Sequence, residues 1–202
     1  PTIEKMGIHI DFECECAGFF PIGAGQINAT IHPWTKQTKY TALDKGQLID
    51  INGFAAALNI PDNIADRELE VLHSKLELNN RKALKFKGIS QGNTAFVLLN
   101  YEHHQQIFST LGEMKKSAEK VAHDLAKEVK AYLALDAIAD EYLADQLLLP
   151  MALGKGGVFT AQIISEHTRT QADMIQKFLD CKIEFSSIHD HFQVSVQCHQ
   201  TL

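Results

Sequence analysis

The chain has 202 residues, of which 45% are apolar and 22% are charged, the balance of an ordinary globular protein with one large domain or two small ones. No apolar run approaches the ~20 residues that a membrane span needs, and no signal-peptide pattern opens the chain, so we expect no membrane partner. The net charge of −6 argues against a general nucleic-acid binder, although a protein that holds only the end of a nucleic acid needs just a local basic pocket.

The four cysteines are Cys14, Cys16, Cys181 and Cys198, and no CxxC pair occurs. Cys14 and Cys16 alternate on a predicted strand, so they share a face and are poorly placed to form a disulfide with each other. Four reduced thiols are typical of the cytoplasm, and we predict a cytoplasmic protein rather than a zinc site or a disulfide framework.

The first segment predicts a long antiparallel hairpin. Residues 7–16 (GIHIDFECEC) alternate, with Ile8, Ile10 and Phe12 on one face, which is typical of a strand. A turn rich in glycine and proline follows at 18–25, and residues 26–34 (QINATIHPW) alternate again.

From about Thr38 the chain predicts a small α+β unit. Its expected elements are a short strand at 47–51, a helix capped by Asp62 or Asn63, a strand after Gly92, a short helix at 104–111 and a long helix capped by Ser117. The two longer helices have apolar stripes, namely Ile64, Leu69, Leu72 and Leu76 in the first and Val121, Leu125, Val129 and Tyr132 in the second.

The last part predicts the order helix, strand, helix, hairpin. We expect a buried helix at 136–153, a strand at 158–164, a helix from Thr170 to Leu179 and a hairpin at 182–197 around His189 and Asp190. No low-complexity tract or charge block interrupts this order, which indicates that the sequence has no disordered linker.

One segment of the predicted buried helix carries polar groups. In EYLADQLLLPMAL (141–153), Tyr142, Asp145 and Gln146 fall on one face, where burial is costly unless they bond something. Pro150 lacks an N–H and leaves the carbonyl of Gln146 without its helical partner. The face is either a ligand site or a satisfied hydrogen-bond network with a proline kink.

A second polar segment is SEHTRTQAD (165–173), in which Thr170 and Asp173 resemble a capping box. His167 would then lie just before a helix N-terminus, where free N–H groups and the helix dipole favour an anion. A neutral ring nitrogen facing a phosphate is what nucleophilic attack on phosphorus needs. The alternative is an ordinary surface or capping histidine; the other histidines show no metal-ligand spacing.

These two segments, in this order, resemble two motifs of the RNA 3′-terminal phosphate cyclases. EYLADQLLLPMAL resembles the family's signature helix, and HTRT (167–170) resembles its HTxTN-type motif, whose histidine becomes adenylylated. GFFPIGAGQ (18–26) is similar to the family's GxxPxGGGE turn, and segments 88–99 and 111–129 are similar to its inserted small domain and the helix that leads out of it. The resemblance runs from Pro1 to about Val196.

The resemblance implies an α+β fold, in which a large domain of two-helix, four-stranded repeats is interrupted by an inserted small α+β domain. Residues 1–37 would form a hairpin of the large domain, 38–134 the insert, and 135–202 the last repeat. The family's glycine-rich N-terminal motif has no counterpart here, and the chain opens with Pro1. We therefore expect those residues to lie upstream and this fragment to be inactive, or nearly so, by itself.

The resemblance also implies an ATP-dependent enzyme of the ligase class. His167 would take AMP from ATP, pass it to an RNA 3′-phosphate, and the neighbouring 2′-hydroxyl would close a 2′,3′-cyclic phosphate. The nucleotide pocket would be lined by Tyr142, Leu143, Ala144, Asp145 and Gln146. Within it, Gln146 would bind the adenylate and Asp145 a Mg²⁺ or Mn²⁺ ion on the phosphates.

Several positions depart from the family's pattern. Ala24 replaces the middle glycine of the turn, Gln26 its acidic residue, and Gln171 the asparagine after the threonine of the histidine motif; Lys115 and Lys116 replace a Gly-Val pair. If position 24 needs a positive φ, alanine there costs about 1 kcal/mol.

Two other functions remain open. One is a non-catalytic, cyclase-like factor of ribosome biogenesis, a class that lacks the reactive histidine, so that His167 favours the enzyme. The other is a small α+β binding module without catalysis, which would leave Asp145 and Gln146 without a purpose.

Overall fold

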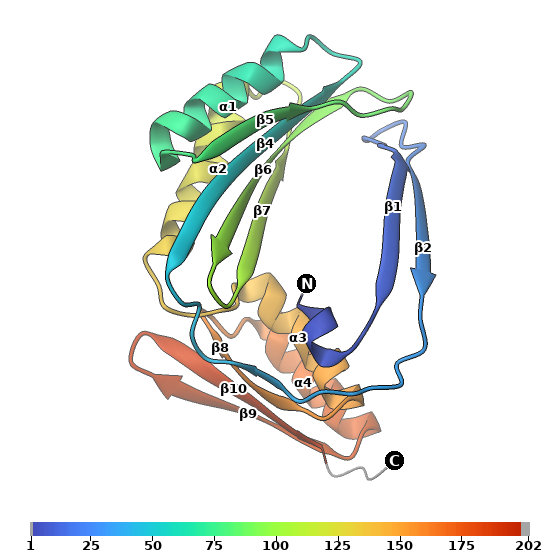
Figure 1. Cartoon of the computed structure of the whole chain (residues 1–202), viewed down its shortest axis with the longest axis vertical. Coiled ribbons are helices and arrows are strands. Elements are labelled where there is room, and N and C mark those ends of the chain that lie inside the picture. Colours follow the sequence, from blue (N-terminus) through green and yellow to red (C-terminus); the bar gives the residue numbers. More distant parts are fainter. Residues whose placement is uncertain (1, 199–202) are drawn as a thin grey trace. The chain divides into compact units, whose positions relative to one another are not determined.

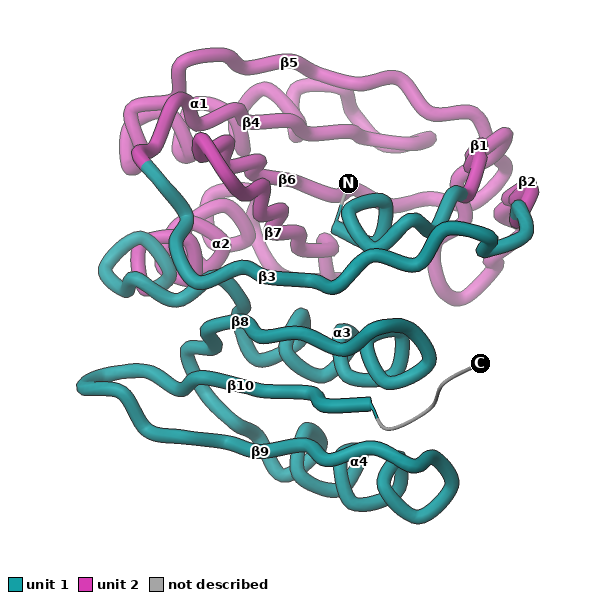
Figure 2. The backbone as a smooth tube through the Cα atoms, turned by 60° about the horizontal axis from the view of Figure 1, so that its bottom comes forward, with its two compact units in different colours: residues 1–9, 32–46, 132–202 teal, residues 10–31, 47–131 magenta. Residues whose placement is uncertain are grey.

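The computed structural model describes residues 2–198 and has an α+β fold with mixed β-sheets (Figure 1). The chain forms two compact units (Figure 2). Unit 1 consists of residues 1–9, 32–46 and 132–202, and unit 2 consists of residues 10–31 and 47–131. Among the described residues, no helix combines the length and the hydrophobicity needed to cross a membrane.

Unit 1 contains a four-stranded sheet in the order β3-β8-β10-β9, with helices packed against it. Its elements are η1 (Ile3–Met6), β3 (Tyr40–Ala42), α3 (Glu141–Leu153), β8 (Gly157–Ala161), α4 (Glu166–Phe178), β9 (Cys181–Ile188) and β10 (His191–Cys198). Strand β3 is parallel to β8, whereas β10 is antiparallel to both β8 and β9.

The core of unit 1 lies where α3 and α4 meet this sheet. Leu147 and Leu148 of α3 pack with Phe159 of β8 and Val194 of β10, and all four side chains are almost completely buried. Ile175 of α4 joins the same core. Burial of this apolar surface is the main stabilising contribution, at roughly 25 cal/mol per Å².

Unit 2 contains a two-stranded hairpin, a four-stranded sheet in the order β5-β4-β6-β7, and two helices. Its elements are β1 (Ile10–Cys16), β2 (Gln26–Ile31), β4 (Leu48–Leu58), α1 (Asn63–Leu76), β5 (Asn80–Leu84), β6 (Gly92–Tyr101), β7 (Gln105–Leu111) and α2 (Ala118–Leu133), whose last residues belong to unit 1. Strand β4 is parallel to β5, and β6 is antiparallel to β4 and β7.

Both helices of unit 2 lie on one face of the four-stranded sheet (Figure 1). On that face, Ala95, Val97 and Leu99 of β6 are fully buried. The guanidinium of Arg67 in α1 binds the carboxylate of Glu119 in α2 at 2.7 Å, which holds the two helices side by side. The other face of the sheet therefore has no helix from this unit.

The expected hairpins are confirmed. Strands β1 and β2 pair antiparallel in unit 2, and β9 and β10 do so in unit 1. The closed end of the first hairpin is hydrogen-bonded to the β5–β6 connection, where the N–H of Ala17 donates to the carbonyl of Lys87 and the N–H of Phe19 donates to the hydroxyl of Ser90. The cap of α2 is also confirmed, because Ser117 Oγ accepts from the N–H of Lys120 at 3.2 Å.

The expected helix at 104–111 is wrong, because this segment is strand β7. Gln106 and Phe108 are buried, whereas Ile107 between them and Ser109 after them are exposed, which is the period of a strand. The segment pairs with β6 along its whole length.

The helix expected from 136 begins only at Glu141, because the Asp140 side chain caps it by accepting from the N–H of Leu143 at 2.7 Å.

Candidate functional site

Helices α3 and α4 lie side by side in unit 1 and bring the two polar segments together. Asp145 of α3 and Gln171 of α4 form the clearest link between them. With the Gln171 amide oriented so that its nitrogen faces the carboxylate, it donates to Asp145 Oδ1 and lies 3.3 Å from the Asp145 backbone carbonyl. Both side chains are half-buried. The residue that departs from the family's asparagine is thus a direct partner of the expected metal ligand.

His167 is exposed and lies in the first turn of α4. It precedes Gln171 by four residues, so the two side chains lie on the same face of the helix, one turn apart. That face is the one that carries the contact with Asp145. The ring is therefore neither in the apolar core nor on the side of α4 that faces away from α3.

The helix around His167 begins earlier than the sequence predicts. Ser165 is the N-cap, with extended backbone (φ −69°, ψ 165°), and its Oγ accepts from the N–H of Thr168 at 3.2 Å. The expected cap at Thr170 is wrong: Thr170 lies inside the helix and is exposed. The physical reason is that Ser165 is an equally good cap, and Thr168 three residues later bonds back to it, with 3.0 Å between the two hydroxyl oxygens.

This shift changes the setting of His167. It places the histidine within the first turn of α4 rather than before it, where backbone N–H groups lack partners inside the helix. Those groups and the positive end of the helix dipole favour an anion such as a phosphate beside the ring. Glu166 in the same turn carries a negative charge, which partly offsets this field.

The five expected nucleotide-binding residues divide into two groups. The side chains of Tyr142 and Gln146 are exposed and Asp145 is half-buried, so these three face outward. Ala144 is fully buried and Leu143 packs against the core, so their side chains support the helix from below. Tyr142 is 62% exposed, and the half-buried carboxylate of Asp145 accepts from the Gln171 amide, so this polar face is solvated or hydrogen-bonded.

Asp145 is the side chain of this region that the sequence predicts to bind a metal ion. Within residues 2–198, no group of three or more His, Cys, Asp or Glu side chains is arranged to hold a metal. A single carboxylate fits Mg²⁺ only in the mode in which substrate phosphates and water complete its octahedron, and Asp145 as such a ligand stays a prediction. Asp140 is the cap of α3, and its Oδ1 already accepts from the N–H of Leu143 at 2.7 Å.

Two residues in the turn of the first hairpin, Ala24 and Gln26, depart from the family's pattern. Ala24 has φ 60°, in the left-handed region, and follows Gly23 at φ 67°. Gln26, at the position of the family's acidic residue, donates to the carboxylate of Glu15, which also accepts from the amide of Asn28.

Comparison with known proteins identifies the family. The sequence model described as RNA 3′-terminal phosphate cyclase matches residues 1–185. The chain belongs to the RNA 3′-terminal phosphate cyclase family. The resemblance in the signature helix and the histidine motif is thereby confirmed at the level of the family.

Three curated relatives, each named RNA 3′-terminal phosphate cyclase, are similar to the chain. The protein from Koribacter versatilis is 39% identical over 189 residues, which covers 92% of this chain and 53% of the relative. Those from Pseudomonas fluorescens and Ralstonia nicotianae are 32% and 34% identical, cover 98% of this chain, and are themselves covered to 58% and 57%. The chain thus spans a little more than half the length of the cyclases that it matches.

Proposed function

We propose that this chain is the part of an RNA 3′-phosphate cyclase that carries the adenylylated histidine. The observation that supports this most directly is the position of His167: it is exposed in the first turn of α4, one turn from the contact between Gln171 and Asp145. Family membership supplies the chemistry, and the geometry leaves His167 accessible to a nucleotide on the same face as Asp145.

The proposed reaction has three steps. An unprotonated ring nitrogen of His167 attacks the α-phosphorus of ATP, the bond to the bridging oxygen breaks, and pyrophosphate leaves with the bonding electrons. An oxygen of the RNA 3′-phosphate then attacks the phosphorus of the histidine–AMP, which breaks the N–P bond and frees the imidazole. The adjacent 2′-hydroxyl finally attacks the 3′-phosphorus and loses its proton, and AMP departs from the 2′,3′-cyclic phosphate.

In this proposal the chain's residues position the reactants. The N–H groups at the start of α4 hold phosphate oxygens beside His167. The outward face of α3, with Tyr142 and Gln146, contacts the adenylate, while Leu143 and Ala144 fix that face to the core. A Mg²⁺ or Mn²⁺ ion held by Asp145 would neutralise charge on the phosphates. Positioning and charge neutralisation provide most of the acceleration in such transfers.

The domain assignment is part of the proposal. We propose that residues 38–134 are the family's inserted small domain, and that residues 1–37 and 135–202 belong to its large domain. Residues 135–202 support this for the last repeat, since they form two helices, α3 and α4, and three strands, β8, β9 and β10. The fourth strand of their sheet is β3, at 40–42. Because relatives extend well beyond the matched length, we also propose that the 202-residue chain alone is inactive or nearly so.

A cyclisation assay tests the function. In a chimera, this chain replaces the matched segment of the Koribacter versatilis relative, and an RNA with a 3′-phosphate is incubated with ATP and Mg²⁺. We expect formation of the cyclic end, with a loss of at least 10³-fold in His167→Asn and full activity in His189→Asn, an exposed histidine of the β9–β10 turn. Undiminished cyclisation by His167→Asn would instead exclude His167 as the residue that carries AMP.

A further inference from the structure

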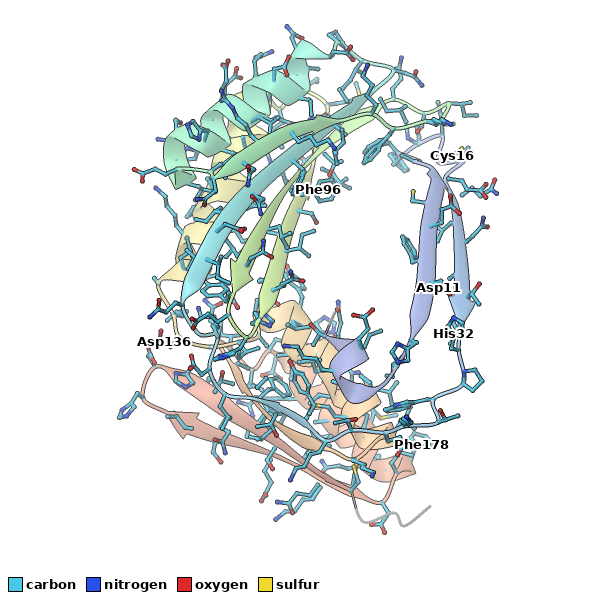
Figure 3. All side chains as sticks on the ribbon, in the orientation of Figure 1. Asp11, Cys16, His32, Phe96, Asp136 and Phe178 are labelled. Carbon is cyan, nitrogen blue, oxygen red and sulfur yellow. The ribbon has the colours of Figure 1, made fainter. Side chains whose placement is uncertain are left out.

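The face of the unit 2 sheet that is turned away from α1 and α2 carries a row of aromatic and polar side chains. Because Ala95 and Val97 of β6 point toward the helices, Phe96 between them points to the opposite face, where Figure 3 labels it. On β7, Ile107 and Leu111 of that face are 60% and 61% exposed. Exposed apolar side chains gathered with polar ones on one face of a sheet are typical of an interaction site.

Strand register defines the central row of this face. Phe54 of β4 is the direct partner of Phe96, Lys82 of β5 is the partner of Phe54, and Ser109 of β7 is the partner of Phe96. Directly opposed side chains on adjacent strands are about 5 Å apart. Lys82, Phe54, Phe96 and Ser109 therefore form a strip of roughly 15 Å across the sheet, with two half-buried rings at its centre.

Amide side chains occupy one end of the same face. Asp50 Oδ1 accepts from the amides of Asn52 and Asn100 at 2.6 Å each, and the Gln105 amide donates to Asn100 Oδ1 at 2.9 Å. Fixed amides offer both donors and acceptors, which suits the edges of unpaired bases. The carboxylate of Asp50 is shared between two amides, and it lies four residues along β4 from the aromatic row.

The edge strand next to the aromatic row is basic. Arg81 and Lys82 of β5, with Lys85 and Lys87 just after it, are all exposed. This is a concentrated positive segment in a chain whose net charge is −6. A row of cations beside stacking rings is the combination that holds a single-stranded nucleic acid, with phosphates on the cations and bases on the rings.

We propose that this face of the unit 2 sheet binds single-stranded RNA, with bases stacked on Phe54 and Phe96 and phosphates along β5. A four-stranded sheet with helices on one face and aromatic rings on the other stacks two or three bases in known RNA-binding modules. The inference rests on the proposed function in taking RNA as the substrate. It adds a contact for the body of the strand, separate from the 3′ end that reacts at His167.

A second copy of the chain fits this face less well. The centre of a protein–protein interface is depleted of charged residues, and lysine is disfavoured there. Here Lys82 lies in the aromatic row itself, Arg81 precedes it, and Lys85 and Lys87 follow it along the chain. The charge pattern therefore favours a polyanion.

The test is a fluorescence-anisotropy titration of the 202-residue chain with a labelled oligouridylate of about eight nucleotides that ends in a 3′-hydroxyl. We expect Phe54→Ala and Phe96→Ala each to weaken binding about tenfold, and Phe96→Tyr to stay within about threefold of the unmodified chain, because a phenol ring still stacks. Lys82→Ala should lower the slope of log K against log salt by about 0.7.

Matched controls use the same residue types elsewhere. Phe178→Ala removes a ring that is 79% exposed in unit 1, and Lys127→Ala removes an exposed cation of α2; both should leave binding unchanged. Circular dichroism and urea midpoints confirm that each variant is folded. Unaltered affinity of a folded Phe96→Ala, or equal affinity for duplex RNA, would overturn the proposal. So would concentration-dependent self-association that depends on Phe96 without RNA binding, since the face would then be a protein contact.

The RNA in this test has no 3′-phosphate and no ATP is present, so binding is measured without the reaction. His167→Ala should bind as tightly as the unmodified chain. If histidine labelling of the chimera succeeds but RNA binding does not depend on Phe54 and Phe96, only this inference fails. If binding depends on the rings but His167 is never labelled, only the proposed function fails.

Discussion

The side-chain amide of Gln171 donates to the carboxylate of Asp145 and so connects the first turns of α4 to α3, one helical turn from His167. Because Asp145 is half-buried, this is a charge-assisted bond of roughly 1–2 kcal/mol. We expect a double-mutant cycle of Asp145→Ala and Gln171→Ala in the 202-residue chain to give a coupling free energy of about 1 kcal/mol in urea unfolding. Additivity of the two variants within about 0.3 kcal/mol would show that the bond does not stabilise the fold.

The corrected start of α4 gives a second prediction. Ser165→Ala removes the acceptor for the N–H of Thr168 and should lower the free energy of unfolding by about 1 kcal/mol. Thr170→Ala is the matched control; it replaces an exposed residue inside the helix with the best helix former and should leave stability unchanged or slightly higher. The reverse order of the two effects would support the cap expected from the sequence.

In the turn of the first hairpin, substitutions at two neighbouring positions should change the free energy of unfolding in opposite directions. Ala24 has φ 60°, so Ala24→Gly should raise the free energy of unfolding by about 1 kcal/mol. Gly23 has φ 67° and open space where a Cβ would lie, so Gly23→Ala should lower the free energy of unfolding by a similar amount through the backbone alone. Urea unfolding measures both. Equal signs would contradict the left-handed conformation of this turn.

Glu68 of α1 makes the stability of the chain depend on pH. Burial raises the pKa of Glu68 to about 7 from 4.5, although the amide of Asn93 opposes the shift, and Oε2 has no hydrogen-bond partner in the described part of the chain. The folded chain therefore binds a proton that the unfolded chain releases between about pH 4.5 and 7. The stabilisation that this bound proton gives to the folded chain is complete below pH 4.5 and is lost as the pH rises through 7.

Glu68→Gln isolates this effect, because the amide keeps the shape and the bond to Asn93 without a charge. We expect the variant and the unmodified chain to be equally stable near the lower end of that pH window. Above that window, the variant should be more stable by roughly 3 kcal/mol. Urea midpoints at several pH values provide the comparison. A constant difference across the whole range would show that Glu68 does not titrate in the folded state.

Much of the local structure could be predicted from sequence patterns. The hairpins, the long helices and the Ser117 cap follow from alternation, apolar stripes and capping residues, which are local signals. The sequence does not predict strand β7, because its period-two pattern is short and becomes plain only from the pairing with β6. Strands β3 and β5 carry no clear sequence signal, because β3 is short and β5 is mostly polar; tertiary pairing rather than propensity makes them strands.

The candidate site was predictable in part. The motifs identified His167 and Asp145, but not that Gln171 is the side chain that connects α4 to Asp145, since spacing along one helix does not reveal what the next helix presents. Ser165 could have been found, because Ser165 and Thr168 offer a capping pair that competes with Thr170 and Asp173. The aromatic row of unit 2 needed strand register, which places Phe54 beside Phe96 from distant parts of the chain.

The most direct test of the central claim locates AMP on the protein. The chimera is incubated with Mg²⁺ and ATP labelled at the α-phosphate, and the labelled peptide is sequenced by tandem mass spectrometry. We predict acid-labile label on His167, absent from His167→Asn, retained in His189→Asn and strongly reduced in Asp145→Asn. Label on another residue, or full labelling of a folded His167→Asn, would contradict the account.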